Sequence, residues 1–266
     1  MQYLFQSWQS FSADTRAAAH ILLLSDYDGT LTPIVSKPDE AILSPGVREK
    51  LRILAGKPKF SVGIISGRPL AETRNMVGVA GIYYAGNHGL EIEGQGLNYV
   101  NPAAEATRAE IKSLVGQLSA SLGKIRGVII EDKGLSLSVH YRLVEQGDES
   151  QVAEVFHRVT SPLQSKGKIR ITSGKKVWEI RPPIDWHKGK AVALIRDEIK
   201  KLLRLEQLLT IYLGDDTTDE DAFKVVCRPQ GWSIFVGQEN SPSSADYFLN
   251  SPAEVADFLS RLVELC

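Results

Sequence analysis

The sequence predicts an α/β protein with a Rossmann-like parallel-sheet core that is interrupted by an inserted α+β domain. Three patterns support this prediction. Short apolar runs alternate with helix-like stretches from Ile21 to about Tyr84. Near Pro102 the pattern changes to amphipathic helices and strictly alternating strands, and beyond Pro182 the first pattern returns. Strands that alternate with helices indicate right-handed βαβ units and a parallel sheet.

The first part of the core is predicted from continuous apolar runs, which are typical of strands buried on both faces. Ser44 is suited to cap the first of two helices because its hydroxyl can accept a hydrogen bond from a free backbone N–H. The predicted strands are Ile21–Leu24, Phe60–Ile65 and Ile82–Ala85, and the predicted helices lie near Pro45–Leu54 and Pro69–Val77.

The insertion reads as helix, two strands, helix, two strands, or αββαββ. Its first helix has Ile111, Leu114, Val115, Leu118 and Leu122 at helical spacing, and its second has Val152, Val155, Phe156 and Val159. Between them, residues 135–142 alternate apolar and polar, which predicts a strand with one solvated face. Two further strands, Lys168–Thr172 and Lys176–Ile180, complete the unit.

The core resumes with the amphipathic helix Lys188–Leu203, the strands Thr210–Leu213 and Trp232–Val236, and the closing helix Pro252–Leu265. We therefore expect the core domain to comprise residues 1–101 and 182–266, and the inserted domain to comprise residues 102–181. The first twenty residues carry no pattern that assigns them a role.

Composition excludes several classes of partner. The net charge of −1 provides no overall attraction to nucleic acid or to an acidic membrane surface. No apolar stretch reaches the length of a membrane span, and the first twenty residues lack the continuous apolar segment of a secretory signal. The two cysteines, Cys227 and Cys266, have no metal-site spacing. We expect a cytoplasmic monomer that acts on a small molecule, without nucleic acid or membrane partners.

Asp26 and Asp28 follow the first predicted strand directly and are separated by one residue. In open α/β sheets the ligand crevice lies outside the carboxyl ends of the strands. Residues i and i+2 of a regular strand point to the same face, so the two carboxylates can aim at one small volume. Gly29 and Thr30 then permit a sharp turn. The same residues also suit an ordinary turn without any chemistry.

Three further segments occupy comparable positions. Ser66, after the second strand, offers a hydroxyl and helix-opening N–H groups to an anion, or simply caps the helix. Lys188 opens a core helix and could hold a phosphate, although a solvated lysine is the alternative. Asp215 and Asp216 begin a run of five acids within seven residues, in which Thr218 is suited to cap the next helix.

These groups together indicate phosphoryl transfer. A phosphate ester needs a nucleophile, a cation that neutralises developing charge, and a proton for the leaving oxygen. Asp26 can attack phosphorus, and Asp28 can serve as the general acid and base. Oxygen-only ligands favour Mg²⁺, for which Asp26, Asp215, Asp216 and the backbone carbonyl of Asp28 are the candidates. Ser66 and Lys188 can hold the phosphoryl oxygens.

In this order, the four segments resemble the motifs of the haloacid dehalogenase superfamily of aspartate-nucleophile phosphatases. The insertion lies between the second and third motifs, as does the larger cap of that superfamily, and its αββαββ pattern is similar to the C2B subtype. The chain also resembles a narrower family, the trehalose-6-phosphate phosphatases. The matching segments are Asp26–Ile34, Ile65–Arg68, Gly86–Glu91, Ser138–Arg142, Trp178–Pro182 and Gly214–Asp221.

The resemblance implies Mg²⁺-dependent hydrolysis of trehalose 6-phosphate through an aspartyl-phosphate. It assigns substrate binding to Arg68, Asn87 and His88 in the core, and to Glu131, Lys133, His140, Arg142 and Glu179 in the cap. A solvated outer face is the alternative for His140 and Arg142. Phosphatases for sucrose 6-phosphate or for mannosyl- or glucosyl-3-phosphoglycerate would share the same core. A catalytically silent sugar-phosphate sensor is the alternative from another class of protein.

Overall fold

The computed structural model describes residues 1–35, 37–229 and 231–265. Cys266, one of the two cysteines, therefore lies outside the described residues. The chain divides into two compact units, a core formed by Met1–Tyr99 with Trp186–Cys266 and a cap formed by Val100–Asp185. Along the described residues, no helix combines the length and the apolar character that crossing a bilayer requires.

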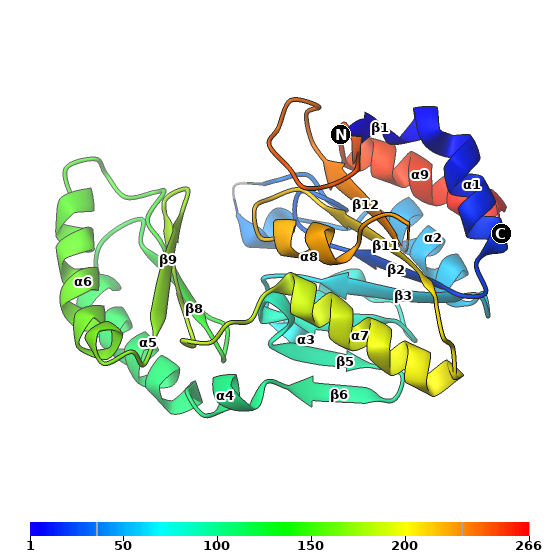
Figure 1. Ribbon diagram of the computed structural model, residues 1–266. Coiled ribbons are helices and arrows are strands. Elements are labelled where there is room, and N and C mark those ends of the chain that lie inside the picture. The colour runs from blue at the N-terminus through cyan, green and yellow to red at the C-terminus, as the bar shows by residue number, and fades with distance from the viewer. Residues whose placement is uncertain (36, 230, 266) are drawn as a thin grey trace. The chain divides into compact units, whose positions relative to one another are not determined.

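The core unit is built on one sheet, which has nine strands over the described residues, in the order β1-β13-β12-β11-β2-β3-β4-β5-β6 (Figure 1). In this spatial order, each strand from β1 through β13, β12, β11, β2 and β3 to β4 runs parallel to its neighbours, whereas β5 is antiparallel to β4. The strands are β1 Gln2–Tyr3, β2 Ile21–Ser25, β3 Phe60–Ile65, β4 Tyr83–Gly86, β5 Glu91–Gly94, β6 Leu97–Val100, β11 Leu209–Gly214, β12 Gly231–Val236 and β13 Tyr247–Leu249.

Helices cover both faces of this sheet. The α-helices are α1 Trp8–Ala17, α2 Pro45–Ala55, α3 Leu70–Val77, α7 Lys188–Leu203, α8 Glu220–Val225 and α9 Pro252–Leu265. Among the residues that the structure describes, short 3-10 segments are η1 Leu4–Ser7, η2 Pro38–Glu40 and η3 Asn87–Gly89. One apolar core joins Leu23 and Ile64 to α1, α2 and α9, and another joins Leu22 and Leu24 to α7 and α8. Alternate residues of β2 thus enter opposite cores, which explains its unbroken apolar run.

The predicted strands and helices of the core are confirmed with small shifts at their ends, and α7 and α9 have the predicted bounds. Ser44 caps α2 as predicted, because its Oγ accepts a hydrogen bond from the N–H of Val47 at 3.2 Å. The elements β1, α1, β5, β6 and β13 were not predicted. In the N-terminal segment, Phe11 packs edge-on against Trp232 with ring centroids 5.0 Å apart, so aromatic packing attaches this segment to the core.

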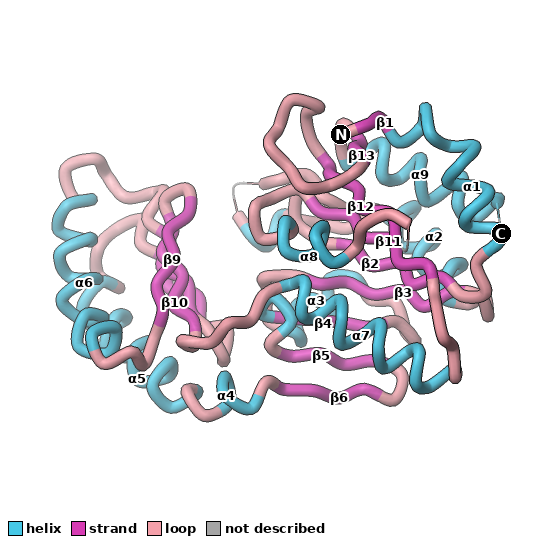
Figure 2. Tube along the Cα trace, viewed as in Figure 1, coloured by secondary structure: helices cyan, strands magenta, loops and turns pink. Residues whose placement is uncertain are grey.

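The cap unit consists of an antiparallel sheet with helices packed against it, and the sheet has four strands over the described residues (Figure 2). The strand order is β7-β8-β10-β9, and the αββαββ order is the predicted one, preceded by one short helix. The elements are α4 Pro102–Glu105, α5 Arg108–Leu122, β7 Ile129–Asp132, β8 Leu137–His140, α6 Glu149–Ser165, β9 Arg170–Gly174 and β10 Val177–Arg181.

The prediction of a solvated face on residues 135–142 is wrong for Ser136 and Ser138, which are 1% and 2% exposed. Ser138 lies in the register between Glu131 of β7 and Glu179 of β10. Its strand is therefore central to the sheet, and long side chains on both neighbouring strands flank the short serine. Alternation alone does not distinguish a central strand from an edge strand.

Candidate active site

Four of the predicted site residues lie directly after the carboxyl ends of parallel strands in the core unit. Asp26 follows β2, Ser66 follows β3, Asn87 follows β4 and Asp215 follows β11. These strands are neighbours in the order β11-β2-β3-β4, so the sheet itself brings together segments that are far apart in the sequence. The location agrees with the general rule that ligands bind outside the carboxyl ends of parallel strands.

Asp26 is held in place by its backbone and by a buried lysine. Its N–H donates to the carbonyl of Leu213 at 2.8 Å, which continues the pairing of β2 with β11. The ammonium of Lys188 donates to Asp26 Oδ1 and to Asp219 Oδ1, each at 2.8 Å. Lys188 is only 2% exposed, so the alternative of a solvated lysine is excluded.

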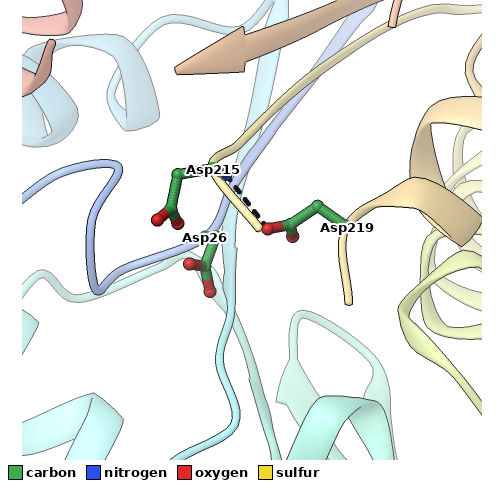
Figure 3. Close-up of side chains that lie close together, drawn as sticks. All are labelled: Asp26, Asp215 and Asp219. Atoms are coloured by element: carbon green, nitrogen blue, oxygen red, sulfur yellow. Dashed lines mark hydrogen bonds between the residues drawn. The ribbon is translucent and has the colours of Figure 1, made fainter. Parts of the chain in front are cut away.

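Three acids form the centre of the site. Figure 3 shows the carboxylates of Asp26, Asp215 and Asp219 gathered at the strand ends, and one oxygen of each lies within 4.8 Å of the others. Burial is the largest cause that raises the pKa of Asp26 well above its ordinary value, against the opposing effect of Lys188. Burial, together with Asp219 and Asp216, raises the pKa of Asp215 to about 7.

The charges of this cluster fit a divalent cation. Three carboxylates face the single ammonium of Lys188, so full ionisation would leave two negative charges in a buried space. The donors are all oxygens, which is the chemistry that Mg²⁺ prefers. The raised pKa values of Asp26 and Asp215 have the same origin, because protonation of a carboxyl group reduces the repulsion among the neighbouring carboxylates and the cost of burying their charge.

Gly29 allows the turn after Asp26 to pass close to Asp215. Its φ of +82° lies in the left-handed region, where residues with a Cβ are strained. A Cβ at this position would also lie 2.0 Å from Asp215 Oδ2. Thr30, on the same turn, donates its hydroxyl to Asp215 Oδ1 at 3.2 Å. The turn therefore serves the site by geometry and by a hydrogen bond.

Asp28 has a different cationic partner from Asp26. The guanidinium of Arg68 donates from Nε to Asp28 Oδ2 at 2.7 Å and from Nη2 to Asp28 Oδ1 at 2.8 Å, and Nη1 donates to Glu72. A bidentate pair of this kind fixes the orientation of the carboxylate as well as its charge. In this structure Arg68, predicted to bind substrate, thus orients Asp28.

Ser66 does not open a helix as predicted, because α3 begins only at Leu70 and is preceded by Pro69. Instead its Oγ accepts a hydrogen bond from the N–H of Arg68 at 3.1 Å and shapes the turn after β3. The N–H of His88 donates to the Ser66 carbonyl, and the N–H of Asn87 donates to the Arg68 carbonyl. The turns after β3 and β4 are therefore bonded to each other.

Asn87 and His88 both have left-handed backbones, with φ of 50° and 56°. Asn87 Nδ2 donates to Glu91 Oε1 at 2.6 Å, which anchors the Asn87 side chain. A Cβ on Gly67 would lie 2.8 Å from the ring of His88, so a side chain there would displace the imidazole. The core substrate residues named from the resemblance are therefore neighbours in space.

Asp216 lies apart from the acid cluster. Its Oδ1 accepts hydrogen bonds from the N–H and the hydroxyl of Thr218, at 2.7 and 2.6 Å. Burial tends to raise its pKa, but Lys188 and the two bonds from Thr218 outweigh burial and hold the pKa below its ordinary value. The prediction that Thr218 caps α8 is wrong, because this hydroxyl is bonded to Asp216 and Asp219 occupies the cap position.

The cap unit brings four of its five predicted residues into one network. His140 Nε2 lies 2.9 Å from Glu131 Oε2, and Lys133 Nζ lies 3.9 Å from Glu131 Oε2 and 3.7 Å from Glu179 Oε1. Arg142 is separate, because it is exposed and its Nη2 donates to the carbonyl of Lys175 at 3.3 Å.

Sequence reasoning missed Asp219, which the structure places in the acid cluster, and Tyr212, whose hydroxyl donates to Asp219 Oδ1 at 2.6 Å. The available signal for Asp219 was its place four residues after Asp215, at the start of a helix where an acid is favourable. Tyr212 carried no such signal, since an aromatic residue in an apolar strand reads as core.

Comparisons of the sequence with known proteins agree on one family. A sequence model described as "Trehalose-phosphatase" matches residues 24–253. "Probable trehalose-phosphate phosphatase D" of Arabidopsis thaliana is 39% identical over an alignment of 262 residues, which covers 95% of this chain and 69% of that protein. "Trehalose-phosphate phosphatase" of Mycobacterium tuberculosis H37Rv is 39% identical over an alignment of 254 residues, which covers 94% of this chain and 63% of that protein.

Solved structures give the same result. The C-terminal domain of the trehalose-6-phosphate phosphatase of C. albicans superposes with a TM-score of 0.78 at 27% identity, covering 97% of each chain. A haloacid dehalogenase-like hydrolase from Bacteroides thetaiotaomicron superposes with a TM-score of 0.62 at 18% identity, covering 91% of this chain and 99% of its own, which shows the fold alone. The chain therefore belongs to the trehalose-phosphatase family, a family of phosphatase enzymes, and has the haloacid dehalogenase-like fold.

Proposed function

We propose that this protein hydrolyses trehalose 6-phosphate to trehalose and phosphate, with Mg²⁺ as cofactor and an aspartyl-phosphate as intermediate. The observation that carries the proposal is the pairing of Asp26, at the end of β2, with the buried ammonium of Lys188 at 2.8 Å. A carboxylate in this position can act as a nucleophile, and the ammonium beside it can neutralise an incoming phosphoryl group. The names of the relatives supply the substrate.

In the first step, a carboxylate oxygen of Asp26 attacks phosphorus, and the bond between phosphorus and the sugar oxygen breaks. The leaving alkoxide takes a proton from the carboxyl group of Asp28. Trehalose departs, and Asp26 carries the phosphoryl group as an acyl phosphate. Both oxygens of Asp28 accept hydrogen bonds from Arg68 in this structure, so Asp28 must turn away from this contact before it can donate a proton to the leaving oxygen.

In the second step, a water molecule attacks the same phosphorus while Asp28 accepts its proton. The bond between phosphorus and the Asp26 oxygen breaks, which restores the carboxylate and releases phosphate. Asp28 thus regains from water a proton in place of the one that it gave in the first step, and the protein ends in its starting state. Proton transfer by a positioned carboxylate typically contributes on the order of 10²–10⁴-fold to rate.

The cation would be held by the side chains of Asp26 and Asp215, with Asp216 and the carbonyl of Asp28 as further candidates. It would supply neutralisation of the charge that develops on the phosphoryl oxygens. Ser66 and Lys188 would hold those oxygens, and their burial favours this role because hydrogen bonds to a charged group are stronger away from water.

Sugar recognition would come from Arg68, Asn87 and His88 of the core and from the charged residues of the cap. Glu131, Lys133 and Glu179 form a connected set of hydrogen-bonding groups, which suits the alternating donors and acceptors of sugar hydroxyls. His140 belongs to this set through Glu131, while exposed Arg142 would contribute from outside it. We further propose a cytoplasmic monomer with no nucleic acid or membrane partner; the net charge of −1 supports the absence of these two partners.

The decisive experiment is a panel of sugar phosphates tested for phosphate release by the purified protein in Mg²⁺. We expect trehalose 6-phosphate to give a kcat/KM at least about 10-fold above that of sucrose 6-phosphate and the phosphoglycerate esters, because buried polar groups of a site reject ligands that leave them unpaired. A higher value for another sugar phosphate would reassign the substrate. Binding of trehalose 6-phosphate without phosphate release would instead indicate a sensor.

The role of the cap can be separated from that of the core with Glu179→Gln. This variant is expected to raise KM for trehalose 6-phosphate while leaving hydrolysis of p-nitrophenyl phosphate, which has no sugar, unchanged. Glu154→Gln, on an exposed position of α6 in the same unit, is the matched control. Equal losses on both substrates would contradict a recognition role for Glu179.

A further inference from the structure

Asp219 differs from the other two acids of the cluster in the number of hydrogen bonds that it accepts. Its Oδ1 accepts from Lys188 Nζ at 2.8 Å and from the Tyr212 hydroxyl at 2.6 Å. Its Oδ2 accepts from the backbone N–H groups of Asp215 at 3.1 Å and Asp216 at 3.2 Å. The residue is 0% exposed.

Four donors fill the acceptor capacity of a carboxylate, which offers about four lone-pair sites. A cation could bind Asp219 only by displacing one of these donors in a space that water does not reach. Asp26 and Asp215 are less occupied: among the hydrogen bonds of the described residues, Lys188 donates to one oxygen of Asp26 and Thr30 to one oxygen of Asp215. The free acceptor sites of the cluster therefore belong to Asp26 and Asp215.

The bonds of Asp219 instead connect the parts of the site. One oxygen fixes the ammonium of Lys188, which begins α7 and also contacts Asp26. The other oxygen holds two successive N–H groups of the loop that carries Asp215. A Cβ on Gly214 would lie 2.3 Å from Asp219 Cγ, so the strand end approaches the carboxylate without room for a side chain.

The side chain of Tyr212 provides one of the four hydrogen bonds to Asp219. It belongs to β11, is 0% exposed, and packs edge-on against Phe223 of α8 with ring centroids 5.7 Å apart. Strand and helix packing thus fixes the phenol, and its hydroxyl sets the position of Asp219 Oδ1.

We propose that Asp219 and Tyr212 are positioning residues, which hold the ammonium of Lys188 and the Asp215 loop in place, and that Asp219 is not a cation ligand. The inference rests on the proposed function, in which Lys188 holds the transferring phosphoryl group. It narrows the direct side-chain ligands in the three-acid cluster to Asp26 and Asp215.

The test compares Tyr212→Phe with Tyr84→Phe. Tyr84 is a matched control because it is also buried in the same sheet, and its hydroxyl also makes buried hydrogen bonds, to the N and O of Val79 at 3.0 and 2.7 Å. For each variant we would measure kcat and KM with p-nitrophenyl phosphate and trehalose 6-phosphate, the inhibition constant of orthovanadate, and the Kd of Mg²⁺ alone by calorimetry.

We expect Tyr212→Phe to lower kcat and weaken orthovanadate inhibition by on the order of 10-fold, the lower end of the range for outer-shell changes. The Kd of Mg²⁺ should rise by less than about 10-fold, the lower end of that range, because the Tyr212 hydroxyl bonds to Asp219 Oδ1 whereas the loop that carries Asp215 bonds to Oδ2. Both variants should lose some thermal stability with the buried hydroxyl, but Tyr84→Phe should keep the wild-type kcat and the wild-type inhibition by orthovanadate. Wild-type kcat and orthovanadate inhibition in Tyr212→Phe would overturn the role of Tyr212.

Asp219→Asn and Asp215→Asn test whether Asp219 is a ligand. In Asp219→Asn the amide keeps an oxygen that can accept from the two loop N–H groups. We therefore expect the loss of Mg²⁺ affinity in Asp219→Asn to be at least about 10-fold smaller than the loss in Asp215→Asn, because Asp215 would bind the cation directly and Asp219 would not. Equal losses would make Asp219 a ligand. If Asp219→Asn does not fold, the Tyr212 comparison still decides whether the Tyr212–Asp219 pair positions Lys188.

A failure of the proposed function gives a different result. Wild-type protein that hydrolyses p-nitrophenyl phosphate but not trehalose 6-phosphate would reject the substrate, and the Tyr212 comparison would still be read on the first ester. Protein that hydrolyses neither ester would reject the enzymatic function, and the Mg²⁺ Kd values of the two aspartate variants would still decide whether Asp219 is a ligand.

Discussion

Asp26 combines burial, a short contact with Lys188 and a place among other acids, and these features predict the effect of its removal. Asp26→Asn should lower turnover by at least about 10⁴-fold, because loss of a nucleophile removes the reaction path itself. The fold should persist, with a thermal midpoint within about 4 °C of wild type, since Asn keeps the side-chain volume. Phosphate release and calorimetry provide the two measurements.

Asp257→Asn, at an exposed position of α9, is the control for the same change of side chain at a distance from the site. It should leave both measurements at wild-type values. Retention of substantial turnover in Asp26→Asn would reject Asp26 as the nucleophile.

His20 predicts a pH effect that is independent of the active site. Its side chain is buried, with Nε2 2.9 Å from Ser61 Oγ, and burial lowers its pKa below 6.5. The unfolded chain therefore binds a proton more readily than the folded protein between this lowered pKa and 6.5. The stability contributed by the neutral ring is complete above pH 6.5 and is lost as the pH falls below that value.

The measurement is the free energy of unfolding of wild type and His20→Gln between pH 7.5 and pH 5.0. We expect the difference between the two proteins to shrink on acidification, because Gln has no proton to gain. Parallel curves over the whole range would contradict a depressed histidine pKa.

At the scale of single residues, the sequence was informative where a charged side chain stood at a strand end or at the start of a helix. Asp26, Asp28, Lys188 and Asp215 were all recognisable in this way, and the structure places Asp26, Lys188 and Asp215 in one cluster. Which acid bonds to which donor was not recognisable, because that depends on loop conformation. Asp219 was therefore missed, although it accepts four hydrogen bonds.

An aromatic stack packs the strand β10 against the helix α6 of the cap. Trp178 lies between Tyr141 and Phe156, with ring centroids 4.1 and 4.4 Å away and nearly parallel planes. The stack joins β10 to the end of β8 and to α6. Trp178→Ala should destabilise the cap by about 3–5 kcal/mol, the usual cost of removing a large buried aromatic side chain.

Hydrogen exchange read by peptide measures this effect element by element. Cap peptides of Trp178→Ala should exchange faster, while peptides from the core sheet keep wild-type protection. Leu143→Ala, at a side chain 60% exposed in the same unit, should change stability by less than about 0.5 kcal/mol. Faster exchange throughout the core would show that the two units unfold together.

At the scale of elements, predictions were most accurate for long amphipathic helices. The bounds of α7 and α9 were predicted to the residue because apolar spacing and start signals agreed. Short strands were less accurate: β8 occupies only Leu137–His140 of the alternating segment. The strand β1 was missed because its two residues carry no period, and only pairing with β13 makes it a strand.

For the whole molecule, binding of a cation should link activity to stability. Chelation by EDTA should abolish hydrolysis of every phosphate ester, and added Mg²⁺ should restore it. Mg²⁺ at 100 times its Kd should also stabilise the folded protein by about 2.7 kcal/mol, through mass action. The expected signature is a higher thermal midpoint in wild type and no shift in Asp215→Asn.

Ca²⁺ at the same concentration is a useful comparison, because it also binds carboxylates but accepts more ligands at longer distances. It should raise the thermal midpoint without restoring turnover. Unchanged activity in EDTA would reject a cation-dependent mechanism, whatever the thermal data show.

The overall architecture was predictable because the sequence changes its pattern twice, near Pro102 and Pro182. The pairing of β2 with β11 was not predictable, since a period identifies strands but not their neighbours. This pairing sets Ile21 beside Leu209 and so brings Asp26 to Asp215. The acid cluster therefore depends on a contact between chain segments that flank the entire cap.

The stacked rings of Tyr99 and Trp186, with centroids 5.5 Å apart, join the two points at which the chain leaves and re-enters the core. The cap, Val100–Asp185, is therefore inserted into the core as a loop whose two ends are held together. The entropic cost of closing a loop grows only with the logarithm of its length. Evolution can therefore replace, lengthen or shorten that segment at little cost to the core. A different unit inserted between Tyr99 and Trp186 would therefore leave the acid cluster of the core intact.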